Sequence, residues 1–152
     1  MDHLLRKISW LDWRCPLETS EVKIEKVLTE NDLGITKSHQ AGFLIPHRLM
    51  SFGVFPILSD ETLNPRLRII LIDTESNLRY GVNYIKYNNK HFGGTRNEYR
   101  ITGIARFLRL NLLKPGDSIV FQALGIQELR ISFIRHRETK FNANYEKWSI
   151  MK

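Results

Sequence analysis

The sequence predicts a mainly β fold, a barrel or sandwich of short strands with few helices. Short runs of apolar and β-branched residues recur along the chain, and turn-forming residues separate them. Only two short segments between these runs have the spacing of a helix. Many short strands with turn signals between them are typical of closed or nearly closed β architectures.

The first two expected strands lie in the amino-terminal third of the chain. Residues 22–28 alternate apolar and charged side chains, so that Ile24 and the apolar stem of Lys26 share one face. Residues 41–45 form a short apolar run that ends at Pro46, which cannot continue a central strand.

Four further strands are expected along the rest of the chain. Residues 67–72 and 80–87 are rich in apolar, β-branched and aromatic side chains, which favour strands. Residues 118–124 follow a Lys-Pro-Gly-Asp turn at 114–117. Residues 129–134 then alternate apolar with mostly polar side chains, as in a strand with one buried face.

Two short helices are expected between these strands. Residues 49–55 form a poorly defined one. In the second, Ile101, Ile104 and Leu108 recur at helical spacing, which predicts one or two amphipathic turns.

Length and charge restrict the possible partners. A chain of 152 residues with 42% hydrophobic residues suits a single globular domain. Lys and Arg number 23 against 16 Asp and Glu, for a net charge of +7. This surplus favours a polyanionic partner, nucleic acid before a membrane surface, although a solvated basic surface gives the same composition.

The amino-terminal residues match neither a signal peptide nor a membrane span. No apolar run approaches the roughly 18 residues that a spanning helix needs. The apolar residues from Leu4 to Leu11 have helical spacing, and we expect a short amphipathic segment that docks on the domain. Cys15 is the one cysteine, which excludes an internal disulfide and fits a reducing cytoplasm.

The densest polar segment is 87–100, where almost nothing is expected to be buried and Gly93 and Gly94 mark a turn. Arg can donate a bidentate pair to guanine, Asn can do the same to adenine, and Glu can accept from cytosine N4. A carboxylate in this basic loop therefore fits either a cytosine contact or the orientation of a neighbouring arginine. A solvated hairpin with internal Arg–Glu pairs is the alternative. The segment offers Lys90, His91, Arg96, Asn97, Glu98 and Arg100.

A second polar segment, 29–40, lies between the first two expected strands. An ordinary surface turn around Gly34 would explain it equally well. Lys26 at the strand end and Lys37 suit phosphate contacts, which position a protein on DNA without reading sequence. The segment supplies Asn31, Lys37, Ser38, His39 and Gln40.

Three longer patterns add a family resemblance. They read ENDLGITKSHQAGFLIP at 30–46, LNP at 63–65 and YNNKHFGGTRNEYRIT at 87–102. In order and spacing they resemble the amino-terminal effector domains of the EcoRII restriction endonuclease family. A fourth pattern, LKPGDSIVF at 113–121, is similar to plant B3-like DNA-binding domains, which share the same pseudobarrel fold.

The resemblance implies a seven-stranded open DNA-binding pseudobarrel with short flanking helices. Two of its loops would grip the major groove of double-stranded DNA at CCWGG, where W is A or T. Residues 1–152 would be one non-catalytic recognition or effector domain, monomeric when isolated. It would form the amino-terminal part of a longer, IIE-like type II restriction endonuclease in a prokaryotic cytoplasm. The domain would need no cofactor, and Mg²⁺ would serve only a separate, covalently linked nuclease domain.

The family pattern also implies roles for particular residues. The sequence departs from that pattern at Gly94 and Tyr99, where EcoRII carries lysines, which puts phosphate contacts there in doubt. The residues that the resemblance assigns to base readout are His39, Arg96, Asn97, Glu98 and Arg100. Those that it assigns to the DNA backbone or to the gripping loops are Lys26, Lys37, Ser38, Gln40, Lys90, His91, Thr95 and Tyr99.

Two other functions remain open at this stage. A metal-dependent nuclease of the PD-(D/E)xK type would use Asp117 with Glu138 and Lys140 to hold Mg²⁺ and position water. Such short patterns are common in charged chains, and Asp117 lies in a turn where a structural role is expected. A barrel that binds something other than nucleic acid would explain the fold but not the polar segment at 87–100.

Overall fold

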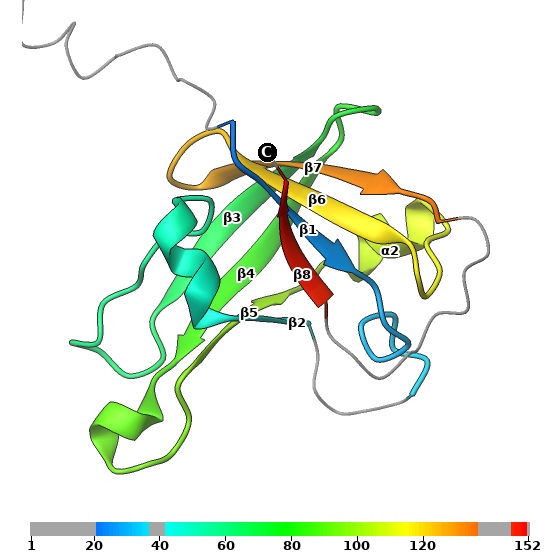
Figure 1. Cartoon of the computed structure of the whole chain (residues 1–152). Coiled ribbons are helices and arrows are strands. Elements are labelled where there is room, and N and C mark those ends of the chain that lie inside the picture. Colours follow the sequence, from blue (N-terminus) through cyan, green and yellow to red (C-terminus); the bar gives the residue numbers. More distant parts are fainter. Residues whose placement is uncertain (1–20, 37–41, 137–146, 152) are drawn as a thin grey trace, which may run out of the picture.

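The computed structural model describes residues 21–36, 42–136 and 147–151. Within them, one curled sheet of eight strands has the order β2-β5-β4-β3-β7-β6-β1-β8 (Figure 1). Neighbouring strands are antiparallel except β3 and β7, which are parallel. In chain order the elements are β1 (Lys23–Val27), β2 (Phe43–Ile45), η1 (His47–Phe52), β3 (Arg66–Asp73), β4 (Arg79–Tyr87), η2 (Asn89–Phe92), β5 (Glu98–Thr102), α2 (Ala105–Leu110), β6 (Ser118–Ala123), β7 (Glu128–Ile134) and β8 (Lys147–Met151).

The predicted mainly β, open-barrel architecture is confirmed. All six strands predicted from residue patterns are present, as β1, β2, β3, β4, β6 and β7. The described residues form eight strands where seven were expected, and residue patterns had indicated neither β5 nor β8.

The predicted helix that begins at Ile101 is wrong in its first half. Ile101 lies in β5, paired with Phe43 of β2 and Tyr84 of β4, and helix α2 begins only at Ala105. Gly103, with φ of 86°, turns the chain between the strand and the helix. Apolar residues at a strand end and at the following helix start therefore imitated the spacing of one helix.

The carboxyl-terminal segment adds a strand that residue patterns did not indicate. β8 pairs with β1 along its whole length, from Lys23↔Met151 to Val27↔Lys147. Trp148 of β8 is buried within this sheet. The predicted amphipathic segment from Leu4 to Leu11 lies outside the described residues, as does Cys15.

The core fills the inside of the curl. Phe55, which follows η1, packs its ring against Tyr84, Phe121 and Trp148 and so joins β4, β6 and β8. Helix α2 contributes Phe107, which packs on aromatic rings of β4 and β7. These aromatic contacts fill the space between opposite parts of the sheet, where a flat sheet would leave its apolar face exposed.

One ion pair lies inside this core. Lys26 Nζ of β1 and Asp32 Oδ2, in the loop after β1, are 2.8 Å apart, and the two side chains are 0% and 1% exposed. The contact is an ion pair rather than an aligned hydrogen bond. The ammonium also lies 5.3 Å from the ring centroids of Phe43 and Trp148. Since these rings belong to the edge strands β2 and β8, the Lys26 cation connects the two edges of the sheet.

We predict that Asp32→Ala lowers the free energy of unfolding by about 3–5 kcal/mol, because it leaves the Lys26 ammonium buried without its counter-charge. Chemical denaturation measures this loss. Glu128→Ala is the control, because its pair with Arg79 is 2.7 Å long but about half exposed. That surface pair should contribute only about 0–1 kcal/mol. Equal losses in the two variants would contradict the role assigned to the buried pair.

Candidate nucleic-acid interface

Two polar loops approach the same pair of strands from opposite ends. The first loop, residues 28–42, leads into β2 and is described up to residue 36 and at residue 42; the second loop, residues 88–97, leads into β5. Because β2 and β5 are antiparallel, with Leu44 opposite Arg100 at the centre, the loops flank this short pair. A strand of this length spans about 10 Å. Both loops lie on the same side of the curled sheet, the first in blue and the second in green (Figure 1).

The first loop can enter β2 only through a glycine. Gly42 has φ of 85°, and a Cβ at this position would overlap the carbonyl oxygen of Ile101 in β5. Any other residue would push β2 away from β5. Close backbone contact thus explains Gly42, the second glycine of the 30–46 pattern.

The second loop is anchored at its base by two asparagines. Asn88 is fully buried, and its Oδ1 accepts from the Asn64 backbone N–H at 2.7 Å. In return the Asn88 backbone N–H donates to Asn64 Oδ1 at 3.2 Å. The Asn88 amide also donates to Asp60 Oδ1 and to the Thr62 carbonyl oxygen. The LNP pattern at 63–65 therefore fastens the neighbouring segment to the base of the second loop.

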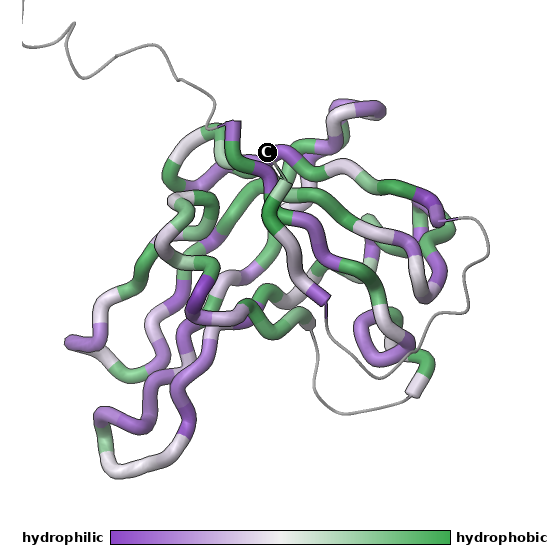
Figure 2. The backbone as a smooth tube through the Cα atoms, viewed as in Figure 1, coloured by the Kyte–Doolittle hydropathy of each residue, from purple (hydrophilic) through white to green (hydrophobic). Residues whose placement is uncertain are grey.

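A third asparagine shapes the tip of the second loop. Asn89 Oδ1 accepts from the Arg96 backbone N–H at 2.6 Å, and the Lys90 backbone N–H donates to the Arg96 carbonyl at 2.9 Å. Gly94 lies so close that a Cβ there would be 2.6 Å from Asn89 Cγ. These contacts hold the loop in one shape, and hydrophilic residues predominate along it (Figure 2).

Glu98, at the start of β5, joins two arginines into one cluster. Its Oε1 accepts from Arg96 Nε at 2.7 Å and from Arg100 Nε at 2.9 Å, and Arg96 Nη2 lies 2.6 Å from the same oxygen. The Arg96 guanidinium also lies flat against the Tyr87 ring, 3.9 Å from its centroid. We call Arg96, Glu98 and Arg100 the Arg–Glu cluster; its carboxylate and the Tyr87 ring fix the planes of the guanidinium groups.

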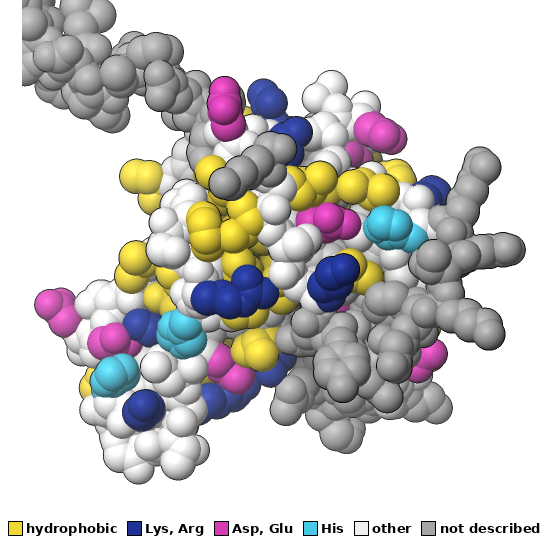
Figure 3. Space-filling model, in the orientation of Figure 1, with side chains coloured by type: hydrophobic (Ala, Val, Ile, Leu, Met, Phe, Trp, Pro, Cys, Tyr) yellow, Lys and Arg dark blue, Asp and Glu magenta, His cyan; other side chains and the backbone are white. Residues whose placement is uncertain are grey.

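The electrostatics of the cluster favour an ionised carboxylate. Partial burial opposes ionisation of Glu98, but hydrogen bonds from Arg100 and Arg96, together with their charges, lower the pKa of this carboxyl below its ordinary value. Glu98 therefore remains an acceptor at neutral pH. Side chains of Lys, Arg and His gather over this part of the surface (Figure 3).

A second group of ionisable side chains, Lys86, Asp60 and His91, lies between β4 and the second loop. Lys86 of β4 is mostly buried, and its Nζ pairs with Asp60 Oδ1 at 2.8 Å. His91 Nε2, on the second loop, lies 3.5 Å from Asp60 Oδ2. Hydrogen bonds from Lys86 and Asn88 lower the pKa of the Asp60 carboxyl, although burial opposes the shift. Asp60 thus lies between Lys86 of the sheet and His91 of the second loop.

The described part of the first loop is a compact turn. Thr29 donates from its backbone N–H and its hydroxyl to Asp32 Oδ2, at 2.8 and 2.9 Å, and the Asp32 N–H donates back to Thr29 Oγ1 at 3.3 Å. The same Asp32 oxygen pairs with Lys26. The NDxG part of the 30–46 pattern therefore fixes where the first loop leaves the sheet.

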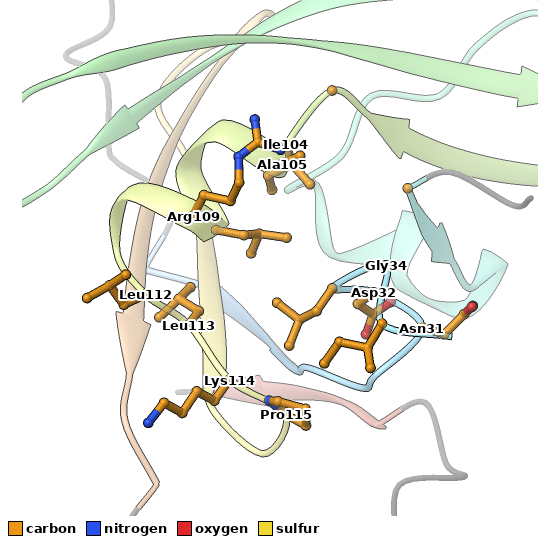
Figure 4. A pocket seen from close by; sticks show the side chains of 15 residues that line it. Asn31, Asp32, Gly34, Ile104, Ala105, Arg109, Leu112, Leu113, Lys114 and Pro115 are labelled. Atoms are coloured by element: carbon orange, nitrogen blue, oxygen red, sulfur yellow. The ribbon is translucent and has the colours of Figure 1, made fainter. Parts of the chain in front are cut away.

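A largely apolar groove of about 920 Å³ lies between the first loop and the segment around α2 (Figure 4). Leu33 and Ile35 line it from the loop, and Leu108 and Leu112 line it from the other side. None of the described residues predicted to contact DNA lines this groove.

The structure brings only some of the predicted site residues together. Arg96, Glu98 and Arg100 meet in the Arg–Glu cluster, although Arg100 is 8% exposed and so presents little surface. Asn97 is half-buried; its carbonyl oxygen lies 3.0 Å from His47 Nε2, and its Oδ1 has no hydrogen-bond partner among the described residues. The predicted contacts that are exposed on the second loop are Lys90, His91, Thr95 and Arg96.

Two predicted contacts are corrected. Lys26 is 0% exposed and paired with Asp32, so it cannot reach a phosphate in this fold. Tyr99 is 1% exposed, stacks on Tyr84 and accepts a hydrogen bond from the Leu58 N–H, so it belongs to the core. Both face inward from strands, and the expectation that 87–100 contained almost nothing to bury is also wrong. The predicted contacts Lys37, Ser38, His39 and Gln40 lie outside the described residues.

Reasoning from the sequence missed several supporting residues. Tyr87 was seen only as a strand residue, and Asn64 and Asn88 only as parts of the family patterns. His47 was not singled out, yet it reaches Asn97 across the loop base. A paired search for asparagines in the LNP and YNN patterns could have suggested the reciprocal contact, whereas nothing in the sequence indicates the stacking of Arg96 on Tyr87.

Asp117, the acid proposed for a nuclease site, serves the turn in which it lies. Its Oδ2 accepts from the Lys114 N–H at 2.9 Å and its Oδ1 from the His136 N–H at 3.2 Å. Glu138 and Lys140 lie outside the described residues. In the described ranges, no group of three or more His, Cys, Asp or Glu side chains is arranged to hold a metal ion. No helix in these ranges is long and apolar enough to cross a membrane.

Comparison with known proteins places the chain in a family. The family described as restriction endonuclease EcoRII, N-terminal, matches residues 18–123. The type II restriction enzyme EcoRII of Escherichia coli is 31% identical over 105 residues, which make up 68% of this chain and 26% of that enzyme. The chain thus spans about a quarter of the length of this curated relative.

Two solved structures are similar to this chain. An Arabidopsis FUS3–DNA complex has a TM-score of 0.55 at 18% identity and covers 74% of this chain and 96% of its own. The B3 domain of the UbaLAI restriction endonuclease, solved with cognate DNA, has a TM-score of 0.49 at 17% identity and covers 93% and 98%. The likeness to FUS3 confirms the predicted open B3-like barrel.

We predict that Glu98 titrates below the value of a glutamate in a disordered peptide, because both arginines stabilise its ionised form. The contribution of the cluster to stability is then complete above that ordinary value and is lost as the pH falls through the lowered one. NMR titration of the Glu98 carboxyl carbon measures the midpoint. Arg96→Gln and Arg100→Gln should each raise it, and an unchanged midpoint in both variants would show that the pairs do not form in solution.

Proposed function

Because the chain belongs to the family of restriction endonuclease EcoRII N-terminal domains, we propose that it is a sequence-specific double-stranded DNA-binding domain whose two loops act on one duplex. The observation that carries this proposal is the Arg–Glu cluster at the root of the second loop. A carboxylate beside a phosphate backbone is repelled, whereas here Glu98 holds Arg96 and Arg100 in place, so we infer that the cluster as a unit faces bases rather than phosphates.

The cluster has the donors and acceptors that a CC/GG half-site requires. Arg96 uses Nε and Nη2 towards Glu98, and a guanidinium has five N–H donors, so donors remain for guanine O6 and N7. All three arginine contacts converge on Glu98 Oε1. The second carboxylate oxygen is then the atom that accepts from cytosine N4.

The target that we propose is CCWGG, as the family resemblance implies. The first loop and the second loop lie at the two ends of one short strand pair, so a single chain can contact both halves of the site. A major groove about 12 Å wide admits such loops. We therefore expect binding as a monomer, with Lys90 and Thr95 on the exposed second loop and Lys37 on the first loop serving the DNA backbone.

In this proposal DNA cleavage is carried out by a different domain. Asp117 accepts backbone hydrogen bonds from Lys114 in its own turn and from His136 after β7, which supports a structural role for it. We propose that the chain recognises DNA in the bacterial cytoplasm for a linked nuclease domain, to which any Mg²⁺ requirement belongs, in a type II restriction enzyme of the IIE-like kind.

We predict that the 152-residue chain binds a CCWGG duplex more tightly than a duplex with one substituted base pair, by about 1–3 kcal/mol for each substitution. Fluorescence anisotropy measures both affinities. A stoichiometric titration by the same method should report one chain per duplex. Incubation with Mg²⁺ should yield no cleavage products. Products that disappear in Asp117→Ala would establish the nuclease alternative instead, and equal affinity for every duplex would leave only generic basic binding.

We predict that Glu98→Gln lowers the preference for CCWGG by about 1–3 kcal/mol. Glu98 is both the proposed cytosine acceptor and the partner of the two arginines, and the substitution removes its charge. The same variant should bind non-specific duplex more tightly, since one charge that repels phosphates is gone.

Glu61→Gln is the matched control for this experiment. Glu61 is exposed in the segment that precedes β3, and its substitution removes the same charge without touching an arginine. It should leave the preference for CCWGG unchanged. If Glu98→Gln also keeps the full preference, Glu98 is only an internal partner of the two arginines, and base readout by this loop loses its support.

A further inference from the structure

The outward face of β2, β5, β4 and β3 carries more positive charge than the Arg–Glu cluster accounts for. Side chains of these strands point alternately to the core and to the opposite face. On that opposite face Arg66, Arg68 and Arg79 are exposed, whereas Ile85 and Arg100 are buried. Among the described strand residues of this face, the acid is Glu98, within the cluster. The basic residues are Arg66, Arg68, Arg79 and Arg100.

The strand register aligns this charge with the site. Arg66 of β3 pairs with Ile85 of β4, which pairs with Arg100 of β5, which pairs with Leu44 of β2. Neighbouring strands lie about 4.8 Å apart, so the Arg66 and Arg100 backbones are about 10 Å apart on one face. By register, Leu44, Arg100, Ile85 and Arg66 therefore lie in one row on the face opposite the core, and Arg66 is the exposed residue at its end.

Arg68 is held across the next row. It pairs with Asn83 of β4, and its Nη1 donates to Asn83 Oδ1 at 3.3 Å. Its guanidinium lies over Gly81, where a Cβ would overlap it. The absence of a side chain at Gly81 therefore lets Arg68 lie along the sheet instead of extending freely into solvent.

Arg66 and Arg68 form no ion pair with the residues that the structure describes. Arg66 and Arg68 are exposed and pair with no acid among the described residues, whereas Arg79, on the same face, pairs with Glu128 at 2.7 Å. Two exposed arginines without an acidic partner among the described residues, beside the proposed DNA-binding loops, favour contact with phosphates. Such contacts bind DNA without reading its sequence.

We propose that Arg66 and Arg68 form a phosphate-binding track on the outward face of β3, which contacts the duplex backbone beyond the base pairs that the loops read. The track rests on the proposed function, because it requires the loops to bring a duplex to this face. It extends the interface from the two loops onto the sheet itself and makes affinity depend on DNA flanking the site.

The experiment compares two duplexes that contain CCWGG, one with minimal flanks and one extended by about five base pairs on each side. Anisotropy over a range of salt concentrations gives the slope of log K against log salt. On the long duplex, Arg66→Gln with Arg68→Gln should reduce this slope by about 1.8, since each lost phosphate contact removes about 0.9. The reduction should be smaller on the short duplex, and the preference for CCWGG should remain.

The control is Arg79→Gln with Arg130→Gln, which removes the same charge. Both residues flank Ile72 in the register, six residues along β3 from Arg66 and therefore about 20 Å away. This pair should leave the slope of both duplexes close to that of the unsubstituted chain. Gly81→Ala tests position rather than charge: it displaces Arg68 and should remove up to one contact, about 0.9 of slope.

The outcomes separate the two proposals. If the Arg66/Arg68 variant behaves like the Arg79/Arg130 control on the long duplex, the track is refuted while the proposed function stands. If it loses as much slope on the short duplex as on the long one, the arginines act within the recognised site and not beyond it, which also overturns the track. If the unsubstituted chain binds no duplex, both proposals fail.

Discussion

Strands β2 and β5 run antiparallel over only a few residues, and this short pairing determines where both polar loops can lie. Each loop enters one strand of the pair, so antiparallel geometry places the loops at opposite ends of the β2–β5 pair. Gly42 makes the pairing possible because a Cβ would overlap the Ile101 carbonyl. The separation between the loops is thus a property of the backbone, and our proposal that one chain contacts one duplex depends on it.

Each loop is then fastened to the sheet by a polar contact within the barrel. The buried pair of Lys26 and Asp32 holds the root of the first loop, and the reciprocal contacts of Asn64 and Asn88 hold that of the second. Buried polar groups are costly unless they are paired, so each anchor favours one arrangement of its loop. Loops that are fixed at their roots lose less entropy when they bind, which favours recognition by a preformed surface.

Charged side chains on the outside of the sheet are also held by specific partners. Glu98 holds two arginines in one cluster and stays ionised because they lower its pKa. Tyr87 supports Arg96 from the neighbouring strand, where its ring fixes the guanidinium plane. Without these partners the arginines would be flexible cations suited to any polyanion. With them, the group presents donors in a defined geometry, which is the requirement for discrimination between bases.

The sequence by itself determined the mainly β class, six of the strands and the family, because alternation and turn residues are local signals and the 30–46 and 87–102 patterns are long. It also identified Arg96, Glu98 and Arg100 as a group. It did not show that Lys26 and Tyr99 face the core, because their strands meet partners far away in the chain and a lysine pattern carries no sign of a buried counter-charge. The tertiary structure alone decided that Ile101 belongs to a strand, that β8 completes the sheet, and that Arg66 lies in line with Arg100. Those facts depend on register between distant segments, which no local pattern contains.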